Sequence, residues 1–311
     1  MLIILSFSII NKNLQFGNRI MIAATGGITV KLIIALFLGI VQGIAEFLPI
    51  SSSGHLSILQ NLFKMDYSEE KHLLFDVLLH LGTLVSICVV YRTEIKAMIS
   101  DGIEFLRLRN DSDQDEPVTL KPPARVLLFV LAGTLPMIIG AIFSGMVSRL
   151  FFSMGFIGIA LIITGGILFV SEKYVPSGNK TEKTMTIRDA IIIGLAQAVT
   201  ILPGLSRSGT TISVGLACGL NKNYAVRFSL LLSIPAVFGA TIVSLFKAIR
   251  GGTDFSLFPV YMAGTVVAAV VGFFTIQFMR RMMAKSGLGK FAYYCWGVGA
   301  MTLILSLVLA K

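Results

Sequence analysis

The sequence predicts an all-α integral membrane protein, a polytopic helical bundle with about six full spans and two re-entrant helical hairpins in an inverted-topology repeat. The first observation is composition: of 311 residues, 55% are hydrophobic and 14% charged, with a mean hydropathy of +0.85. A soluble domain carries roughly 25% charged residues, so a soluble enzyme is excluded. The second observation is that charged residues divide the chain into apolar stretches. The third is that two longer stretches share one pattern.

Six apolar stretches are close to the ~20 residues that a helix needs to cross the hydrocarbon. We predict full spans at 72–91, 126–147, 155–171, 224–246, 259–279 and 291–310. Lys and Arg gather between them, with six in 92–125, four in 172–189 and four in 280–290. The positive-inside rule places these three connections in the cytoplasm. It also accounts for the net charge of +10 without a nucleic-acid partner.

Two other apolar stretches, 32–63 and 190–221, are too long for one span and too short for two. Gly, Pro, Ser and a charged residue interrupt each of them near its middle. The cytoplasmic connections require each stretch to return to the side from which it entered. We therefore predict two re-entrant hairpins, the first entering from outside and the second from the cytoplasm. Irregular backbone at that depth needs protein or a wet cavity around it.

The two predicted hairpins resemble each other in sequence. An offset of 155 residues pairs Gly39 with Gly194, Gln42 with Gln197, Ser51 with Ser206, Ser53 with Ser208 and Gly54 with Gly209. Repeats that enter from opposite faces indicate an inverted-topology fold with its site near the midplane. We thus expect an N-terminal extension of unassigned role (1–30) and one membrane-embedded domain (31–311). The first repeat covers about 31–171 and the second about 187–311.

Polar residues that suit phosphoryl transfer lie where each hairpin breaks. In the first hairpin, Gln42 and Glu46 share a helix face because they are four residues apart. Pro49 then ends the helix. A turn rich in hydroxyl and N–H groups follows, with an imidazole after it: Ser51, Ser52, Ser53, Gly54 and His55. This turn supplies hydroxyl nucleophiles, a carboxylate and a group for proton transfer.

The second break carries Arg207, a permanent cation within an apolar stretch. A buried guanidinium needs an anionic partner, and its two-pronged geometry matches phosphate. Hydroxyls and the start of a helix surround it, at Ser206, Ser208, Gly209 and Thr211. A structural ion pair between Glu46 and Arg207 is the alternative.

Three further polar residues are weaker candidates. Asp76 and His80 are also four residues apart and either line the outer mouth of the site or bond each other. Gln197 enters as the partner of Gln42 in the repeat.

At these residues the chain resembles the bacterial undecaprenyl-diphosphate phosphatase family, also called the bacitracin-resistance protein family. The segment QGIAEFLPISSSGH, from Gln42 to His55, is similar to its acidic motif, and LPGLSRSGTT, from Leu202 to Thr211, to its Pro-Gly-x-Ser-Arg-Ser-Gly motif. Further similarity lies at Phe75–Leu84, Gly133–Pro136 and Arg227–Ala240. The resemblance covers about 31–311. The chain departs from the family pattern at two points. Gln42 stands at the first acidic position, a permitted variant that leaves any metal role mainly to Glu46, and residues 1–30 extend beyond the usual start.

The resemblance implies hydrolysis of undecaprenyl diphosphate to undecaprenyl phosphate and inorganic phosphate, which recycles the lipid carrier for peptidoglycan synthesis and confers bacitracin resistance. It implies a multi-pass protein of the bacterial plasma (inner) membrane whose active site opens to the periplasmic or outer side. It also implies a divalent cation, Mg²⁺ or Ca²⁺, and a polyprenyl diphosphate lipid as the partner. Glu46, Ser52, His55 and Arg207 are the implied catalytic residues.

Several alternatives stay open at this point. Inverted repeats with broken helices also suit a lipid-carrier flippase or transporter, although a carrier needs no nucleophile beside a base. Ser52 with His55 managing its proton, His55 itself or a water molecule could attack the phosphate. Glu46 could orient His55 or hold the cation. The sequence does not distinguish a monomer from a homodimer.

Overall fold

The computed structural model describes residues 27–63, 69–110, 119–250, 255–285 and 287–309. The extension predicted over 1–30 falls outside these residues except for its last four positions. The regular elements that the structure describes are all helical, apart from one isolated backbone bridge between Lys180 and Leu220. They are α2 (Ile28–Ala45), α3 (Ser52–Leu62), α4 (Glu69–Val90), α5 (Arg92–Asn110), α6 (Pro122–Thr134), α7 (Met137–Val147), η1 (Ser148–Phe152), α8 (Met154–Tyr174), α9 (Ile187–Val199), α10 (Arg207–Ala217), α11 (Lys222–Arg250), η2 (Phe255–Leu257), α12 (Phe258–Lys285) and α13 (Gly289–Leu309).

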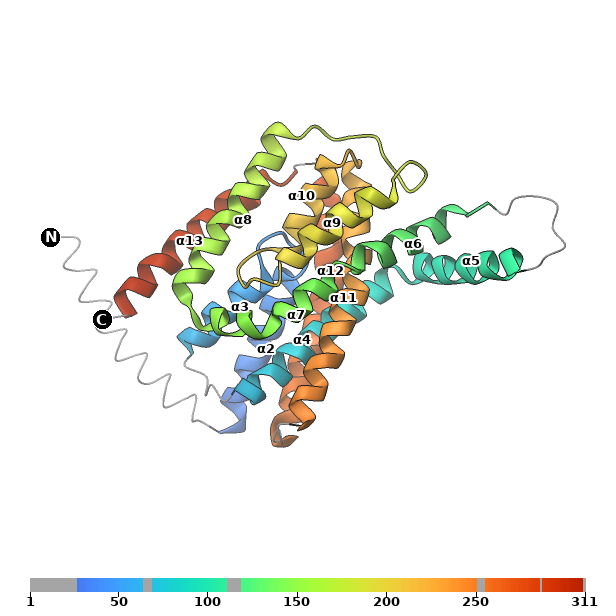
Figure 1. Ribbon diagram of the computed structural model, residues 1–311. Helices are drawn as coiled ribbons and strands as arrows, with labels where there is room; N and C mark the ends of the chain where they lie inside the picture. The colour runs from blue at the N-terminus through green and yellow to red at the C-terminus, as the bar shows by residue number, and fades with distance from the viewer. Residues whose placement is uncertain (1–26, 64–68, 111–118, 251–254, 286, 310–311) are drawn as a thin grey trace.

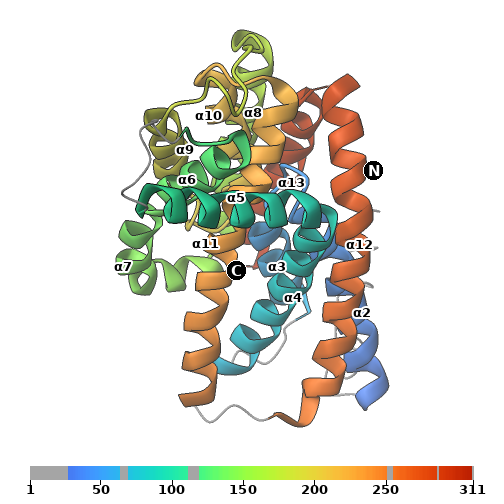
Figure 2. The ribbon, with the colours of Figure 1, turned by 90° about the vertical axis from the view of Figure 1, so that its right-hand side faces the viewer.

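Two broken helical hairpins, α2–α3 and α9–α10, stand where the sequence predicts them. In Figure 1, α2 rises from the lower edge of the bundle while α9 descends from the upper right, and their breaks meet near the middle. The long helices α11 and α12 run beside them through most of the height of Figure 2. The protein is therefore a polytopic helical membrane protein. Within the described residues, six helical stretches are long and apolar enough to cross a bilayer.

The six candidate spans differ in part from the predicted set. α8, α11, α12 and α13 coincide with predicted spans. The fifth candidate is α2, the first arm of the first hairpin. The predicted span 72–91 is α4, which qualifies only together with α5, with a bend of 76° between them. The connection predicted over 92–125 thus contains a helix.

The span predicted over 126–147 is not one continuous helix. It divides into α6 and α7 at Leu135 and Pro136. Proline lacks the N–H that would bond the preceding turn, and its ring collides with a carbonyl of that turn. The apolar composition continues through the break, so the stretch 122–140 still has the length and hydropathy of a span.

Helix pairs related by the repeat pack in matching ways. α2 lies against α12 as α9 lies against α6, while α4 contacts α11 and α8 contacts α13. Small residues permit the closest approaches. A Cβ atom at Gly39 would overlap the backbone of Gly264 in α12, and one at Gly194 would overlap the carbonyl oxygen of Gly133 in α6. Each first arm therefore sits backbone to backbone on a partner helix.

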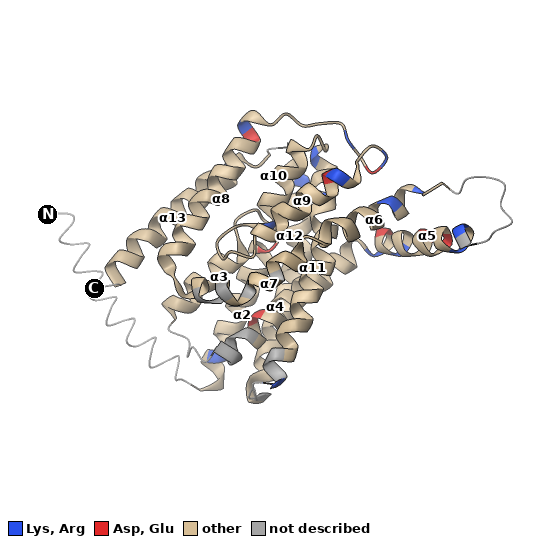
Figure 3. Cartoon of the chain, viewed as in Figure 1, with Lys and Arg blue, Asp and Glu red and all other residues tan. Residues whose placement is uncertain are grey.

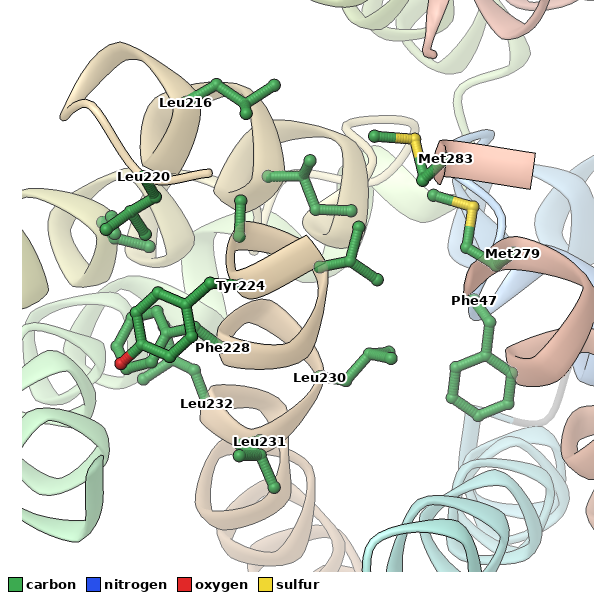
Figure 4. Close-up of a cluster of buried hydrophobic side chains, with 14 of the residues drawn as sticks. Phe47, Leu216, Leu220, Tyr224, Phe228, Leu230, Leu231, Leu232, Met279 and Met283 are labelled. Atoms are coloured by element: carbon green, nitrogen blue, oxygen red, sulfur yellow. The ribbon is translucent and has the colours of Figure 1, made fainter. Parts of the chain in front are cut away.

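A large apolar cluster surrounds the meeting point of the hairpins. It includes Phe47 from the break of the first hairpin, Leu216 from α10, Phe228 from α11 and Met279 from α12. Figure 4 shows Phe47 below Met279 and Met283 and across the cluster from Leu230 of α11. Phe47 is fully buried. Packing of this side chain fixes the backbone immediately after Glu46.

Gly194→Ala tests the close approach of α9 and α6. The added methyl would collide with the Gly133 backbone, so we expect a loss of about 1–3 kcal/mol of stability. Gly166→Ala in α8 is the matched control, because a Cβ there meets nothing within 4 Å and alanine favours helix by about 1 kcal/mol. Thermal unfolding in detergent measures both. Equal melting temperatures for the two variants would contradict the packing described here.

Candidate active site

The candidate active site lies where the breaks of the two hairpins touch. A Cβ added at Gly54 would lie 3.1 Å from Cα of Gly204, and one added at Gly209 would lie 3.2 Å from Cβ of Pro49. The two contacts are equivalent under the repeat. The offset of 155 pairs Gly54 with Gly209 and Pro49 with Gly204, so exchanging the two hairpins turns one contact into the other. The breaks therefore meet about a local two-fold relation, as the paired sequences indicate.

Each second arm begins with the same serine cap. The Ser51 hydroxyl accepts a hydrogen bond from the Gly54 N–H at 3.2 Å, and the Ser206 hydroxyl accepts one from the Gly209 N–H at 3.1 Å. Such caps satisfy N–H groups that the first turn of a helix leaves without partners. Ser51 has φ = 70°, which is unusual for a residue other than glycine. Strained backbone of this kind is concentrated at functional sites.

Glu46 joins the two hairpins through its carboxylate. Oε1 accepts a short hydrogen bond from Nη2 of Arg207. Oε2 accepts from the Ser52 hydroxyl at 2.7 Å and from the Gln42 side-chain amide at 3.0 Å. Nε2 of His80 lies 3.6 Å from the same oxygen. The carboxylate is only 6% exposed, so these groups form its immediate surroundings.

Arg207 is the first residue of α10, and only one of its two terminal guanidinium nitrogens has a hydrogen-bond partner among the described residues. Nη2 is bonded to Glu46, whereas Nη1 is buried and has no hydrogen-bond partner among the described residues. Buried donors of native proteins are nearly always paired. A phosphate oxygen would satisfy Nη1 and suits a guanidinium. The predicted ion pair is present, and it leaves capacity for an anion.

His55 is held by groups other than the predicted nucleophile. Its Nδ1 lies 2.8 Å from the Ser51 carbonyl and its Nε2 lies 2.8 Å from the Tyr294 hydroxyl. The two rings are stacked, with centroids 5.6 Å apart. A carbonyl only accepts, so Nδ1 carries the proton and Nε2 of the neutral ring accepts from Tyr294. The proton of Ser52 is directed at Glu46 instead.

Tyr294 is a site residue that sequence reasoning missed. It lies in α13, 239 residues from His55, and no motif connects the two segments. Thr164 of α8 was also missed. Its hydroxyl donates to the Gly204 carbonyl at 3.0 Å and accepts from the Ser206 N–H at 3.1 Å. The only signal for either residue is a hydrogen-bonding group within an apolar span.

The other predicted hydroxyls hold the breaks together. The Ser53 hydroxyl accepts from the Gly204 N–H at 3.4 Å, and the Ser208 hydroxyl donates to the Leu48 carbonyl at 3.2 Å. These hydroxyls are related by the offset, and Ser208 uses a carbonyl because Pro49 has no N–H to donate. Thr211 bonds the Arg207 carbonyl at 2.8 Å and the Ser229 hydroxyl at 2.6 Å. It therefore connects α10 to α11.

The weaker candidates divide into two groups. Nε2 of His80 approaches Glu46, and its Nδ1 lies 2.8 Å from the Asp76 backbone carbonyl. The Asp76 carboxylate accepts a hydrogen bond from the Gln60 side-chain amide at 2.7 Å. The contact between His80 and Asp76 therefore uses the Asp76 backbone. Gln197 is fully buried, with neither side-chain polar atom bonded among the described residues. No hydrogen bond joins it to Glu46.

The described residues contain no group of three His, Cys, Asp or Glu side chains that could hold a metal ion. What they offer at the site is one carboxylate and the buried Oε1 of Gln42, which has no partner within the described chain. Magnesium is commonly held by one or two protein oxygens together with substrate phosphates. This donor set is therefore compatible with a cation that binds together with a diphosphate.

Comparison with known proteins gives consistent matches over most of the chain. The sequence model described as "Bacitracin resistance protein BacA" matches residues 35–301. A protein of Carboxydothermus hydrogenoformans named undecaprenyl-diphosphatase is 41% identical over 275 residues, covering 87% of this chain and 96% of that protein. Proteins with the same name from Halothermothrix orenii (37% over 272 residues, 87% and 96%) and Methanobrevibacter smithii (39% over 278 residues, 88% and 97%) are also similar.

Tyr294→Phe tests whether the orientation of His55 affects catalysis. Loss of the hydroxyl frees Nε2, and a hydrogen bond worth about 1 kcal/mol corresponds to a roughly 5- to 10-fold lower kcat with little change in stability. Tyr293→Phe is the matched control, because Tyr293 is 63% exposed. Steady-state phosphate release by both variants measures the effect. Equal rates for the two would show that the bond to Tyr294 has only a structural role.

Proposed function

We infer that this chain, which belongs to the bacitracin resistance protein family, is a membrane-embedded undecaprenyl-diphosphatase. The reaction is hydrolysis of undecaprenyl diphosphate to undecaprenyl phosphate and inorganic phosphate. It returns the lipid carrier to cell-wall synthesis and thereby confers resistance to bacitracin. The substrate is an amphiphile, which agrees with a reaction site built inside a helical bundle.

One observation carries this proposal on the structural side. Glu46 bonds Ser52 of its own hairpin and Arg207 of the other, while Nη1 of Arg207 has no hydrogen-bond partner in the described part of the chain. A hydroxyl beside a carboxylate is a nucleophile with a base, and the guanidinium next to it is an anion clamp. A flippase would need the clamp but has no use for the hydroxyl–carboxylate pair. The phosphatase reading is therefore favoured.

We propose that Ser52 attacks the terminal phosphorus. Its proton passes to Oε2 of Glu46, the bridging P–O bond breaks, and undecaprenyl phosphate leaves. Water then hydrolyses the phosphoserine, and Glu46 accepts a proton from that water after releasing the first. The hydrogen bond between Ser52 and Glu46 favours this assignment over proton transfer to His55. Both ring nitrogens of His55 are bonded, to Ser51 and to Tyr294, so in this assignment His55 positions the break that carries Ser52.

The proposed phosphate-binding groups belong mainly to the second break. Arg207 Nη1 faces the substrate as a clamp, and the beginning of α10 adds a positive dipole end. Ser51, Ser53, Ser206, Ser208 and Thr211 position these groups through the contacts described above. Anion stabilisation of this type acts strongly where water is excluded, and both Ser206 and Ser208 are buried.

A divalent cation, Mg²⁺ or Ca²⁺, is part of the proposal. Glu46 and Oε1 of Gln42 would hold it. The bound ion would neutralise charge on the diphosphate. Because Gln42 supplies an amide in place of a carboxylate, the site contributes one formal negative charge to such an ion, and the substrate contributes the rest.

The proposed orientation follows from the charged residues. In Figure 3, Lys, Arg, Asp and Glu gather over the upper and right-hand parts of the bundle, around α5 and the beginnings of α6 and α9. The positive-inside rule assigns these parts to the cytoplasm. The first hairpin then enters from the opposite side. We therefore propose a bacterial inner-membrane protein whose active site opens to the periplasmic or outer side.

Arg207→Lys tests the anion clamp. Lysine keeps the positive charge but loses the planar fork, so phosphate release should fall by about 100-fold or more while the melting temperature stays near that of the wild type. Arg188→Lys, an exposed substitution at the start of α9, is the matched control and should leave the rate unchanged. Near-normal turnover of Arg207→Lys would leave the ion pair with Glu46 as a structural contact only.

The nucleophile is tested by rapid acid quenching with substrate labelled on its terminal phosphate. Wild-type protein should carry acid-stable label, Ser52→Ala should carry none, and its rate should fall by about 100-fold or more. Ser57→Ala in the same helix is the control, since the Ser57 hydroxyl is not among the hydrogen-bond partners of Glu46. If Ser52→Ala retains most activity and His55→Ala abolishes it, the serine nucleophile is wrong.

The cation is tested by phosphate release from a C55 diphosphate, with purified protein before and after chelation. We expect chelation to abolish most activity and Mg²⁺ or Ca²⁺ to restore it. Gln42→Ala removes the other proposed ligand and leaves the base in place, so it should then require more cation for the same rate. Undiminished release in the presence of chelator would remove the cation from the proposal while leaving the phosphatase assignment intact. Absence of release under every condition would contradict that assignment.

A further inference from the structure

A cavity of about 620 Å³ opens at the charged end of the bundle, and no residue of the candidate active site lines it. Its walls come from the beginnings of α5 and α11, the last turns of α12 and the connection before α9. This volume falls within the range of small-molecule sites. The cavity contains three arginines: Arg227, Arg280 and Arg281.

One of these arginines is already neutralised. Nε of Arg227 lies 2.8 Å from Glu94, and its Nη1 lies 4.0 Å from Glu182. Both acidic residues of the lining are thus directed at Arg227. They would otherwise repel an anion.

The other two arginines carry no such compensation. Arg280 and Arg281 form no ion pair among the described residues, and both are exposed. The Arg280 guanidinium lies 5.7 Å from the ring centroid of Tyr91, which orients it without cancelling its charge. Neutral donors surround the same space, including Gln277, Asn223 and Thr181. Together they form a hydrogen-bonding lining with two available cations.

An apolar stripe leads along α12 to this cavity. Val266, Val270, Phe274 and Phe278 are each more than half exposed, and they recur every four residues on one helix face. Arg281 continues the same face three residues beyond Phe278. A chain lying on the stripe would therefore bring its polar end to Arg281. This is the arrangement of a lipid acyl chain and its headgroup.

From these observations we propose that the cavity binds the phosphate group of an anionic membrane lipid, at a site separate from the reaction site. Arg280 and Arg281 pair with the phosphate, the neutral donors bond its remaining oxygens, and the acyl chain lies along the α12 stripe. The two arginines recognise a phosphate group, and inorganic phosphate carries the same group without the acyl chain.

Native mass spectrometry with titrated phosphatidylglycerol or phosphatidylcholine tests this site. We expect the double variant Arg280→Gln/Arg281→Gln to bind phosphatidylglycerol about 30-fold more weakly than the wild type, with phosphatidylcholine unaffected. Lys183→Gln/Arg188→Gln removes two charges at the same end, outside the cavity lining, and should bind as the wild type does. Equal losses of phosphatidylglycerol affinity in both double variants would mean that binding depends on overall surface charge and not on this cavity, and would overturn the proposal.

A second arm uses inorganic phosphate alone, read as a shift in melting temperature. A lipid site predicts no shift at millimolar phosphate, because the acyl chain contributes part of the affinity. A shift that is lost in Arg280→Gln/Arg281→Gln would identify free phosphate as the ligand and overturn the lipid assignment. Phosphatase activity in neutral detergent should be unchanged in this variant. A large loss of activity there would mean that the cavity belongs to the reaction path, and the separate site would be wrong.

Discussion

The structure depends on one ion pair, between Glu46 of the first hairpin and Arg207 of the second. Removing two charges from water is costly, and their mutual attraction repays that cost only with good geometry and with the remaining polar atoms bonded. Ser52 and Gln42 bond the second carboxylate oxygen, and the start of α10 fixes Arg207. The two breaks must therefore meet closely. The serine caps, the small residues at the contact and the packing of Phe47 all serve this requirement.

Much of the fold could be predicted because its signals are local. Two apolar stretches of unusual length, each broken by Pro, Gly and Ser, indicated the hairpins. The i, i+4 spacing of Gln42 and Glu46 placed both side chains on one face, and they are hydrogen-bonded. The break at Pro136 was not predicted, because the span 126–147 was assigned from its apolar composition, which continues through the proline. The helix α5 was missed because its charges resemble those of an exposed connection, although Ile99, Ile103 and Leu106 form an exposed apolar stripe on it.

The site was harder to predict than the fold, because its contacts cross long sequence distances. Spacing suggested that Ser52 would bond His55, three residues away. The structure instead directs Ser52 to Glu46 across the helix break, where no helical periodicity applies. Tyr294 and Thr164 come from spans with no motif. Their roles depend on how α13 and α8 pack against the breaks, which is a property of tertiary structure.

The repeat explains how one scaffold assembles a nucleophile, a base and a cation. The offset of 155 relates Ser52 to Arg207, the first residues of α3 and α10, so the local two-fold brings both to the same place. It relates Glu46 to Ile201, so only the first hairpin contributes a carboxylate at this position. A second carboxylate there would leave one of two buried negative charges without a cation. The backbone shared by the two hairpins brings these positions together. Because the residues differ at the two related pairs, the first hairpin carries the carboxylate and the hydroxyl, and the second carries the guanidinium.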